Sequence, residues 1–258
     1  MIRALTKYWP TQVRGAKDST TMSIEAQLVV IIGGSSGIGL AIAKGAVDAG
    51  ADVTIAGRSQ SKLEQARLAI SGDVTTRSLD ISDEQSLQGF FSQTGPIDHL
   101  VITGGSVKTG SFHAYSLAEA RACMDCKFWG QYMAAHYARI RPKGSLTLLS
   151  GILSRRPSAG VAALAAINAA VEALGRALAI ELAPIRVNVI SPGLTNTPAY
   201  AAMPDDARRG MFAVAAKRSL VGRVGRPEDI ASLALELMCN SFVTGVVVDV
   251  DGGAMLAR

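Results

Sequence analysis

The sequence predicts a single-domain α/β fold built on a doubly wound, seven-stranded parallel sheet. Seven short apolar runs alternate with longer segments of helical pattern, and most runs are almost continuous Val, Ile and Leu. The composition, 48% hydrophobic and 18% charged, supplies enough apolar material for a buried sheet. Continuous apolar strands are typical of sheets covered by helices on both faces. Repeated β-α-β units with right-handed crossovers give the doubly wound arrangement.

The expected elements follow these patterns along the chain. Strands are predicted at Leu28–Ile32, Asp52–Ala56, Thr75–Leu79, His99–Thr103, Ser145–Ser150, Arg186–Ile190 and Val246–Val250. Helices are predicted at Gly37–Ala49, Ser61–Ile70, Glu84–Thr94, Leu117–Arg139, Val161–Leu182 and Pro227–Asn240. We place one domain at residues 26–258, because neither an internal repeat nor a change in amino-acid composition marks a second domain. The long excursion at residues 198–222 is interpreted as a lid over a site, and its apolar residues suggest an apolar pocket.

The first residues differ from the rest in composition. Residues 1–25 carry several Lys and Arg side chains and a Ser/Thr cluster, without an apolar core of their own. We interpret this segment as a mobile basic arm.

The bulk composition argues against several classes of partner. The net charge of +5 is scattered, so a nucleic-acid-binding stripe is not expected. Cys123, Cys126 and Cys239 cannot form a disulfide framework, and we expect a reducing, cytoplasmic location without a metal site. No apolar stretch reaches the roughly 20 uncharged residues of a membrane span. The expected partner is a small-molecule ligand.

The first strand leads into a glycine-rich turn. Gly33-Gly34-Ser35-Ser36-Gly37-Ile38-Gly39 follows the apolar run and opens a helical segment. The glycines allow a sharp turn and let a pyrophosphate approach, and the N–H groups at a helix N-terminus bind anions. A glycine pattern between a strand and a helix therefore indicates a dinucleotide-binding turn.

This turn resembles the TGxxxGIG motif of the short-chain dehydrogenases/reductases, and the similarity continues along nearly the whole chain after Gln27. Asp80-Ile81 resembles the family's adenine-contacting acid, and Ile102-Thr103-Gly104-Gly105 resembles an altered NNAG stretch. The segment from Arg186 to Gly193 is close to its RVN…PG segment. The resemblance implies a Rossmann-type fold and an oxidoreductase acting on hydroxyl or carbonyl substrates. The cofactor-binding residues expected from the turn and the resemblance are Gly33, Ser35, Ser36, Gly37, Ile38, Gly39, Arg58, Ser59, Asp80, Ile81, Gly104, Gly105, Pro192, Gly193 and Thr197.

The end of the second strand bears on which nicotinamide nucleotide is bound. An acid there would accept hydrogen bonds from a ribose 2′-OH, but Gly57 supplies no carboxylate. Arg58 can pair with a 2′-phosphate, and Ser59 adds a donor. We therefore expect NADP(H), with NAD(H) still possible, although Ser36 stands where many NADP-binding relatives carry Arg or Lys.

The resemblance also locates the catalytic positions. The family uses a Tyr acid/base, a Lys four residues later on the same helix, an orienting Ser and an Asn on the preceding long helix. In this chain Leu164 stands at the Tyr position and Asn168 at the Lys position. Gly151 stands at the Ser position, and Lys127 at the Asn position. All four roles are substituted, and neither Leu164 nor Gly151 has a side chain that exchanges protons.

Two interpretations remain open at this point. In the first, the chain has lost the family reaction, since loss of an acid/base typically costs about 10²–10⁴-fold in rate. It would then serve as a cofactor-occupied regulatory or partner subunit. Alternatively it is an active carbonyl reductase that uses other groups, with Lys127 and Ser150 as possible substitutes and Ser154, Asn168 and Tyr200 as contributors. Lys127 can equally be a ribose or phosphate ligand, or a solvated helix residue.

Two further expectations complete the interpretation. The three histidines, His99, His113 and His136, are interpreted as structural or solvent-facing. The resemblance implies a homo-oligomer, a dimer or tetramer, that pairs through the two long helices.

Overall fold

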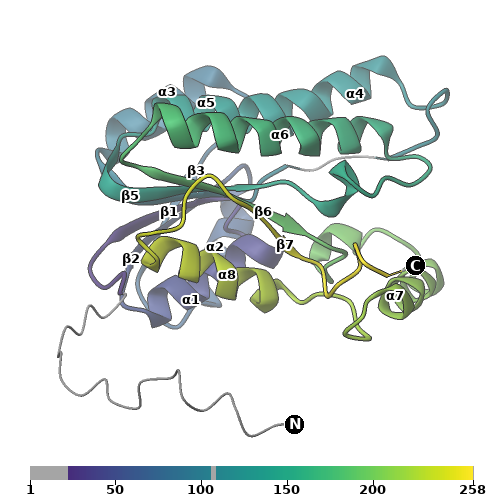
Figure 1. Cartoon of the computed structure of the whole chain (residues 1–258). Coiled ribbons are helices and arrows are strands. Elements are labelled where there is room, and N and C mark those ends of the chain that lie inside the picture. The colour runs from purple at the N-terminus through teal and green to yellow at the C-terminus, as the bar shows by residue number, and fades with distance from the viewer. Residues whose placement is uncertain (1–22, 106–108, 258) are drawn as a thin grey trace, which may run out of the picture.

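The computed structural model describes residues 23–105 and 109–257. All its strands are parallel and form one sheet of seven, in the order β3-β2-β1-β4-β5-β6-β7. The strands are β1 Leu28–Ile32, β2 Asp52–Gly57, β3 Val74–Ser78, β4 Ile97–Ile102, β5 Ile140–Leu149, β6 Arg186–Pro192 and β7 Val247–Val250. The predicted doubly wound, single-domain architecture is confirmed (Figure 1).

Helices cover both faces of the sheet. The helices are α1 Gly37–Asp48, α2 Gln60–Leu68, α3 Glu84–Thr94, α4 Leu117–Met124, α5 Gly130–Tyr137, α6 Ala162–Glu181, α7 Asp205–Arg218 and α8 Pro227–Cys239. In Figure 1, α1, α2 and α8 lie below the sheet, and α3 to α6 lie above it. Alternate residues of β1 divide between the two cores: Val29 packs below and Val30 above, as the two-residue period of a strand requires.

The predicted helix Leu117–Arg139 is not one regular α-helix. A π-helical turn, Asp125–Trp129, separates α4 from α5, and the helical segment ends at Tyr137. Single π turns insert one extra residue and shift the side chains that follow, often at functional sites. Lys127 lies in the middle of this turn.

Residues 198–222 are not an irregular excursion. A 3-10 turn, Pro198–Tyr200, leads into α7, which has two acids in its first turn and two basic residues in its last. These charges favour a helix because they oppose the helix dipole. Figure 1 shows α7 at the right-hand end of the molecule, at about the level of α8.

The N-terminal boundary also lies earlier than predicted. Of the expected arm at residues 1–25, residues 1–22 lie outside the described residues. Ile24 is only 1% exposed and belongs to the core below the sheet. The packed domain therefore includes residues that the sequence assigned to the arm.

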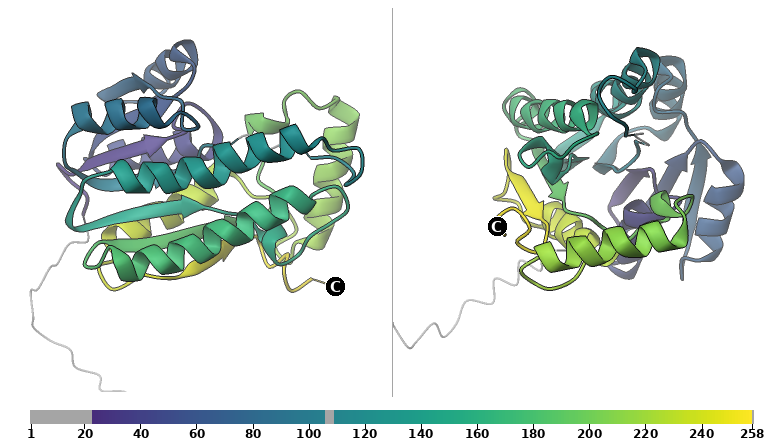
Figure 2. Two further views of the ribbon diagram at one scale, coloured as in Figure 1. Left: turned by 90° about the horizontal axis from the view of Figure 1, so that it is seen from above. Right: turned by 90° about the vertical axis from the view of Figure 1, so that its right-hand side faces the viewer.

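Helix α6 is long and apolar enough to cross a membrane by length and hydropathy, even though it includes Glu172 and Arg176. One such helix is weak evidence, and α6 packs against the sheet through Val171 and Leu174. Only 28% of the 18-residue apolar stretch of this helix is buried. Helices α4 and α6 lie side by side (Figure 2, left).

Candidate nucleotide site and catalytic positions

The glycine turn packs tightly against the end of β4. The Gly33 N–H donates to the Ala56 carbonyl at 2.8 Å, and Gly33 adopts a φ of +89°. A Cβ atom on Gly33 would lie 2.6 Å from both the Gly104 nitrogen and Thr103 Oγ1. Only glycine fits this position, because it tolerates the positive φ and the close approach of the backbone.

The N-terminus of α1 is open to an anion. Ser36 is the N-cap residue, but its side chain makes no capping hydrogen bond. The first N–H groups of a helix need partners from outside it. Thr197 lies directly beside this point, since a Cβ on Gly37 would be 3.2 Å from Thr197 Cβ. The structure thus brings together the turn and Thr197, which are about 160 residues apart in the chain.

Arg58 and Asp80 lie at the ends of neighbouring strands β2 and β3. Asp80 Oδ1 accepts hydrogen bonds from Ser82 Oγ at 2.6 Å and from the Ser82 N–H at 3.0 Å. The Ser82 hydroxyl, with smaller contributions from the Ser82 N–H and the Arg58 charge, lowers the pKa of Asp80. Arg58 is exposed, and Ser59 Oγ accepts from the Lys62 N–H at 3.4 Å, which caps α2. A cation and hydroxyls are therefore available at this edge.

The other expected cofactor residues occupy the same end of the sheet. Ser35 faces the end of β2, with its hydroxyl 3.8 Å from where a Cβ of Gly57 would lie. Gly193 donates to the Val250 carbonyl at 3.0 Å, so Pro192-Gly193 closes the end of β6. Ile81 is buried in the core above the sheet, where its side chain packs against Gly130.

Three of the four catalytic positions, Lys127, Gly151 and Asn168, meet at the end of β5. Lys127 Nζ donates to the Ser150 carbonyl at 3.0 Å, and Asn168 Nδ2 donates to the Gly151 carbonyl at 3.3 Å. Two helices on one face thus bind two consecutive carbonyls. Leu164 is partly buried on α6, four residues before Asn168 and on the same side of the helix.

Lys127 is not a solvated helix residue. It keeps some exposed surface, but surrounding protein atoms desolvate its ammonium group and lower its pKa to about 8, a shift that the Cys126 thiol partly opposes. A buried ammonium loses hydration that favours its charged form. The side chain also packs against Gly105, where a Cβ would lie 3.2 Å from Lys127 Cγ.

Glu172 was not expected at the site from the sequence, but it gathers Ser150, Ser154 and Arg155 into one group, the Glu172 cluster. This carboxylate is only 6% exposed and accepts from Ser154 Oγ at 2.6 Å and from Ser150 Oγ at 3.1 Å. Arg155 Nε lies 3.7 Å from Glu172 Oε2, and Arg155 also pairs with Asp249 beyond it. Glu172 follows Asn168 by four residues, and this helical spacing was the one signal that could have placed it at the site.

Tyr200 and the three histidines make no hydrogen bond or ring contact with Lys127, Ser150, Asn168 or Glu172. Tyr200 stacks edge-on against Phe212, with ring centroids 5.8 Å apart, and burial raises its pKa. His99 is buried, with its ring nitrogens 2.8 Å from Ser145 Oγ and 2.6 Å from Gln27 Oε1. Its structural role is confirmed, while His113 and His136 are exposed.

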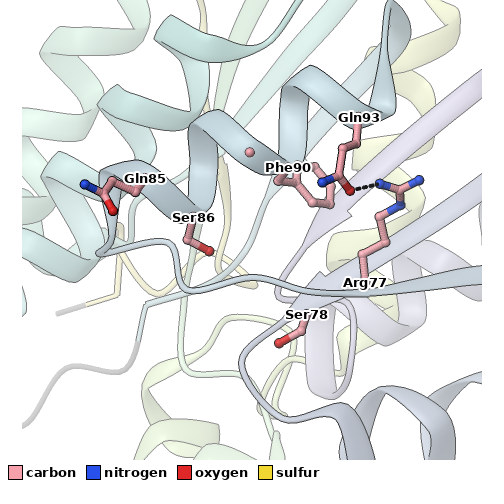
Figure 3. A pocket seen from close by; sticks show the side chains of 7 residues that line it. Arg77, Ser78, Gln85, Ser86, Phe90 and Gln93 are labelled. Carbon is pink, nitrogen blue, oxygen red and sulfur yellow. Dashed lines mark hydrogen bonds between the residues drawn. The ribbon is translucent and has the colours of Figure 1, made fainter.

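A separate surface pocket lies between β3 and α3 (Figure 3). Polar side chains line it, and Arg77 Nη1 donates to Gln93 Oε1 at 3.3 Å across it. None of the residues expected at the nucleotide or catalytic positions belongs to this lining. The pocket is therefore separate from the nucleotide site and from the catalytic positions.

The fold and these positions match one large family. The family model described as enoyl-(acyl carrier protein) reductase matches residues 33–255. The short-chain dehydrogenase/reductase ATR9 of Stachybotrys chlorohalonatus is 35% identical over 91% of this chain and 99% of its own length. The short-chain dehydrogenase/reductase malC of Malbranchea aurantiaca is 31% identical over 88% of this chain and 94% of its own.

Solved structures agree with these relatives. A small-chain dehydrogenase solved in complex with NADPH is 40% identical, with a TM-score of 0.79 over 90% of this chain and all of that one. The MalC reductase/Diels-Alderase from Malbranchea aurantiaca is 30% identical, with a TM-score of 0.85 over 90% of this chain and 98% of that one. The fold and the glycine turn of this chain are those of the α/β proteins that bind nicotinamide nucleotides. The chain belongs to the short-chain dehydrogenase/reductase family of oxidoreductases.

Proposed function

We propose that this chain binds NADP(H) and has a degenerate active site that performs little of the family's carbonyl–hydroxyl reaction. The nucleotide proposal is supported by the open N-terminus of α1, by Arg58 at the end of β2, and by the related structure that holds NADPH. Arg58 and Ser59 would hold the 2′-phosphate, and the glycine turn would hold the pyrophosphate. The bound nicotinamide would supply a hydride.

The observation that carries the second half of the proposal is the set of groups at the end of β5. The side chains of Gly151 and Leu164 carry no exchangeable proton, and the Asn168 amide already donates its hydrogen bond to the Gly151 carbonyl. Asn168 is only 1% exposed and cannot supply the cation that lowers a phenol's pKa from near 10. The described tyrosines, Tyr115, Tyr132, Tyr137 and Tyr200, all lie elsewhere in the chain.

The active alternative rests on Lys127. Its lowered pKa, about 8, would let it exchange a proton near neutral pH. On this alternative Lys127 protonates the reduced carbonyl oxygen, with Ser150 and Ser154 as neighbouring hydroxyls. Turnover by the wild-type protein that is lost in Lys127→Met would favour it.

A third alternative is a cofactor-occupied partner or regulatory subunit. Trp129, the last residue of the π turn, and Tyr132 are nearly half exposed and meet edge-on, with ring centroids 5.5 Å apart. Together with the uncovered part of α6, they support a homo-oligomer formed through the α4–α5 and α6 helices.

The test combines binding with restoration of the missing groups. NADPH and NADH affinities are measured by fluorescence titration, and a panel of aldehydes and ketones is assayed with the wild type and with Leu164→Tyr/Asn168→Lys. The matched control, Leu164→Phe/Asn168→Met, has similar bulk without the hydroxyl and the charge. We expect NADPH binding in all three proteins and turnover only in the Tyr/Lys variant.

A third substitution sharpens the test. A Cβ on Gly151 would lie 3.0 Å from Asn168 Nδ2, so Gly151→Ser crowds the wild-type amide. In the Asn168→Lys background that amide is gone, and the serine should raise turnover further. Wild-type turnover comparable with the reconstructed variant would contradict the degenerate site, and failure to bind either nucleotide would contradict the cofactor.

A further inference from the structure

Lys127 is presented to the site by two unusual backbone features. The π turn Asp125–Trp129 replaces a regular helical turn at this residue. Gly105, with a φ of +145°, leaves room above its stem, where a Cβ would be 3.3 Å from Lys127 Cβ. A side chain at position 105 would crowd the lysine, and a regular helix would aim residue 127 differently.

The ammonium group retains unused donors. An ammonium has three N–H donors, and among the described residues one of them is bound, to the Ser150 carbonyl. The charged groups of the neighbouring Glu172 cluster, Glu172 and Arg155, make no hydrogen bond or ion pair with Lys127. Lys127 therefore has donors to spare at the carboxyl end of the sheet.

Asn168 holds the next peptide along. Its amide binds the Gly151 carbonyl, and its Oδ1 is buried without a partner among the described residues. The lysine and the asparagine thus grip consecutive carbonyls of one segment, from two different helices. In the family arrangement described above the two residue types stand the other way round, with Asn at position 127 and Lys at position 168.

The sheet order shows which part of a dinucleotide would meet this pair. The order reverses between β1 and β4, and a dinucleotide binds across such a point with its phosphates at the first helix. Arg58 and Asp80, on the β2–β3 side, would take the adenosine half. The nicotinamide half would then lie over β4, β5 and β6, where Lys127 stands.

We infer that Lys127 and Asn168 are a reciprocally exchanged pair, in which Lys127 binds an oxygen of the nucleotide's nicotinamide half and Asn168 positions the Ser150–Gly151 peptide that supports it. The inference rests on the proposed nucleotide binding and adds to it a binding residue on the α4–α5 segment. The pair works as a unit, because both head groups act on the same short stretch of backbone.

The first test separates the two halves of the ligand. NADPH and adenosine 2′,5′-bisphosphate, which lacks the nicotinamide half, are titrated into the wild type and Lys127→Met. We expect NADPH to bind about tenfold more weakly to the variant, as for a lost charge-assisted hydrogen bond, and the fragment to bind within about twofold. Lys143→Met is the matched control, since Lys143 is exposed near the opposite end of β5.

The pH profile gives a second readout. Lys127 binds the oxygen best when charged, so the wild-type affinity for NADPH should fall as the pH rises through about 8, while Lys127→Met should lack this step. The fragment should show no step in either protein, and Cys126→Ala should keep the step for NADPH, which excludes the neighbouring thiol.

The coupling of the pair is tested by exchanging it back. Lys127→Asn and Asn168→Lys should each weaken NADPH binding, the latter because it adds a second ammonium beside Lys127. The double exchange should return to within about threefold of the wild type. Thermal unfolding of each variant checks that it is folded.

The contrary outcomes are distinct. Equal NADPH affinity and an equal pH profile in Lys127→Met, or additive losses in the double exchange, would overturn this inference alone. A wild-type protein that binds the fragment and not NADPH would overturn it too. A wild-type protein that binds neither compound would overturn the proposed function along with it.

Discussion

The glycine turn gives the prediction whose size follows most directly from the structure, the substitution Gly39→Ala. The new Cβ would overlap the Gly33 carbonyl oxygen and lie 2.8 Å from the Gly33 carbonyl carbon and 2.6 Å from Thr103 Oγ1. Ordinary contacts begin at about 3.4 Å. Because the nearest atom is backbone in a turn fixed by β1 and β4, side-chain rotation cannot relieve the overlap.

Overpacking of this kind costs about 1–3 kcal/mol of the free energy of unfolding. For a domain of this size each kcal/mol lowers the unfolding midpoint by about 2–4 °C. The same shift would move the N–H groups of α1 away from the phosphate position, so NADPH affinity should fall more than tenfold. Urea unfolding followed by circular dichroism and NADPH titration measure the two effects.

Gly89→Ala is the matched control, since Gly89 lies within α3 and its added Cβ would meet nothing within 4 Å. Replacing glycine inside a helix should stabilise the protein by about 0.5–1 kcal/mol without changing affinity. A Gly39→Ala protein as stable as the wild type and equally able to bind NADPH would refute the close-packed turn as the reason for the glycine.

Two more predictions concern charge. Burial, with the Arg186 charge as a smaller factor, lowers the pKa of His99 from 6.5 to about 4, so the folded state holds the imidazole neutral. The stability of the folded state with a neutral His99 is therefore complete above pH 6.5 and is lost as the pH falls towards 4, because the unfolded chain takes up the proton first. The difference corresponds to about 3 kcal/mol at most, and urea unfolding between pH 4 and 7 should show a shallower decline in His99→Gln, whereas parallel curves would contradict it. Arg58→Ala should weaken NADPH binding about tenfold and leave NADH within about twofold, by titration; an equal loss for both would argue against a 2′-phosphate contact.

The strands could be predicted closely because they are buried on both faces. In six of the seven predicted strands, both ends lie within two residues of the observed ends. The exception is β5, which begins at Ile140, five residues before the predicted start. The added residues of β5, such as Arg141 and Lys143, are exposed and polar, so no apolar run marks them. A polar strand end is fixed by its partner strand, which a pattern along one segment does not reveal.

The helices show where local pattern loses information. The π turn between α4 and α5 uses the same residue types as an α-helix, so nothing in Asp125–Trp129 distinguishes it. Helix α7 buries none of its residues fully and lacks an apolar stripe. Its signal was electrostatic: Asp205 pairs with Arg208 three residues later at 2.7 Å, and Asp206 pairs with Arg209 in the same way.

At the site, the sequence could assign positions and not contacts. The turn and Arg58 were found because a strand-to-helix phosphate site has a recognisable spacing, and Thr197 was found from the resemblance to the family. The hydrogen bond from Lys127 to the Ser150 carbonyl joins residues 23 apart on different elements, and only the fold brings them together. The same holds for Glu172 and the two serines that it binds.

The Glu172 cluster explains why the end of β5 can keep its shape without the usual catalytic side chains. A carboxylate this buried is costly unless it is paired and hydrogen-bonded, and here it accepts from two hydroxyls and faces Arg155. Arg155 in turn reaches Asp249 on β7, so these contacts link α6 to the far edge of the sheet. Because this support uses neither position 151 nor position 164, side chains there can be lost without releasing the backbone that they flank. It follows that a tyrosine restored at position 164 should meet an intact frame, while a lysine at position 168 must donate to the Gly151 carbonyl in place of the Asn168 amide.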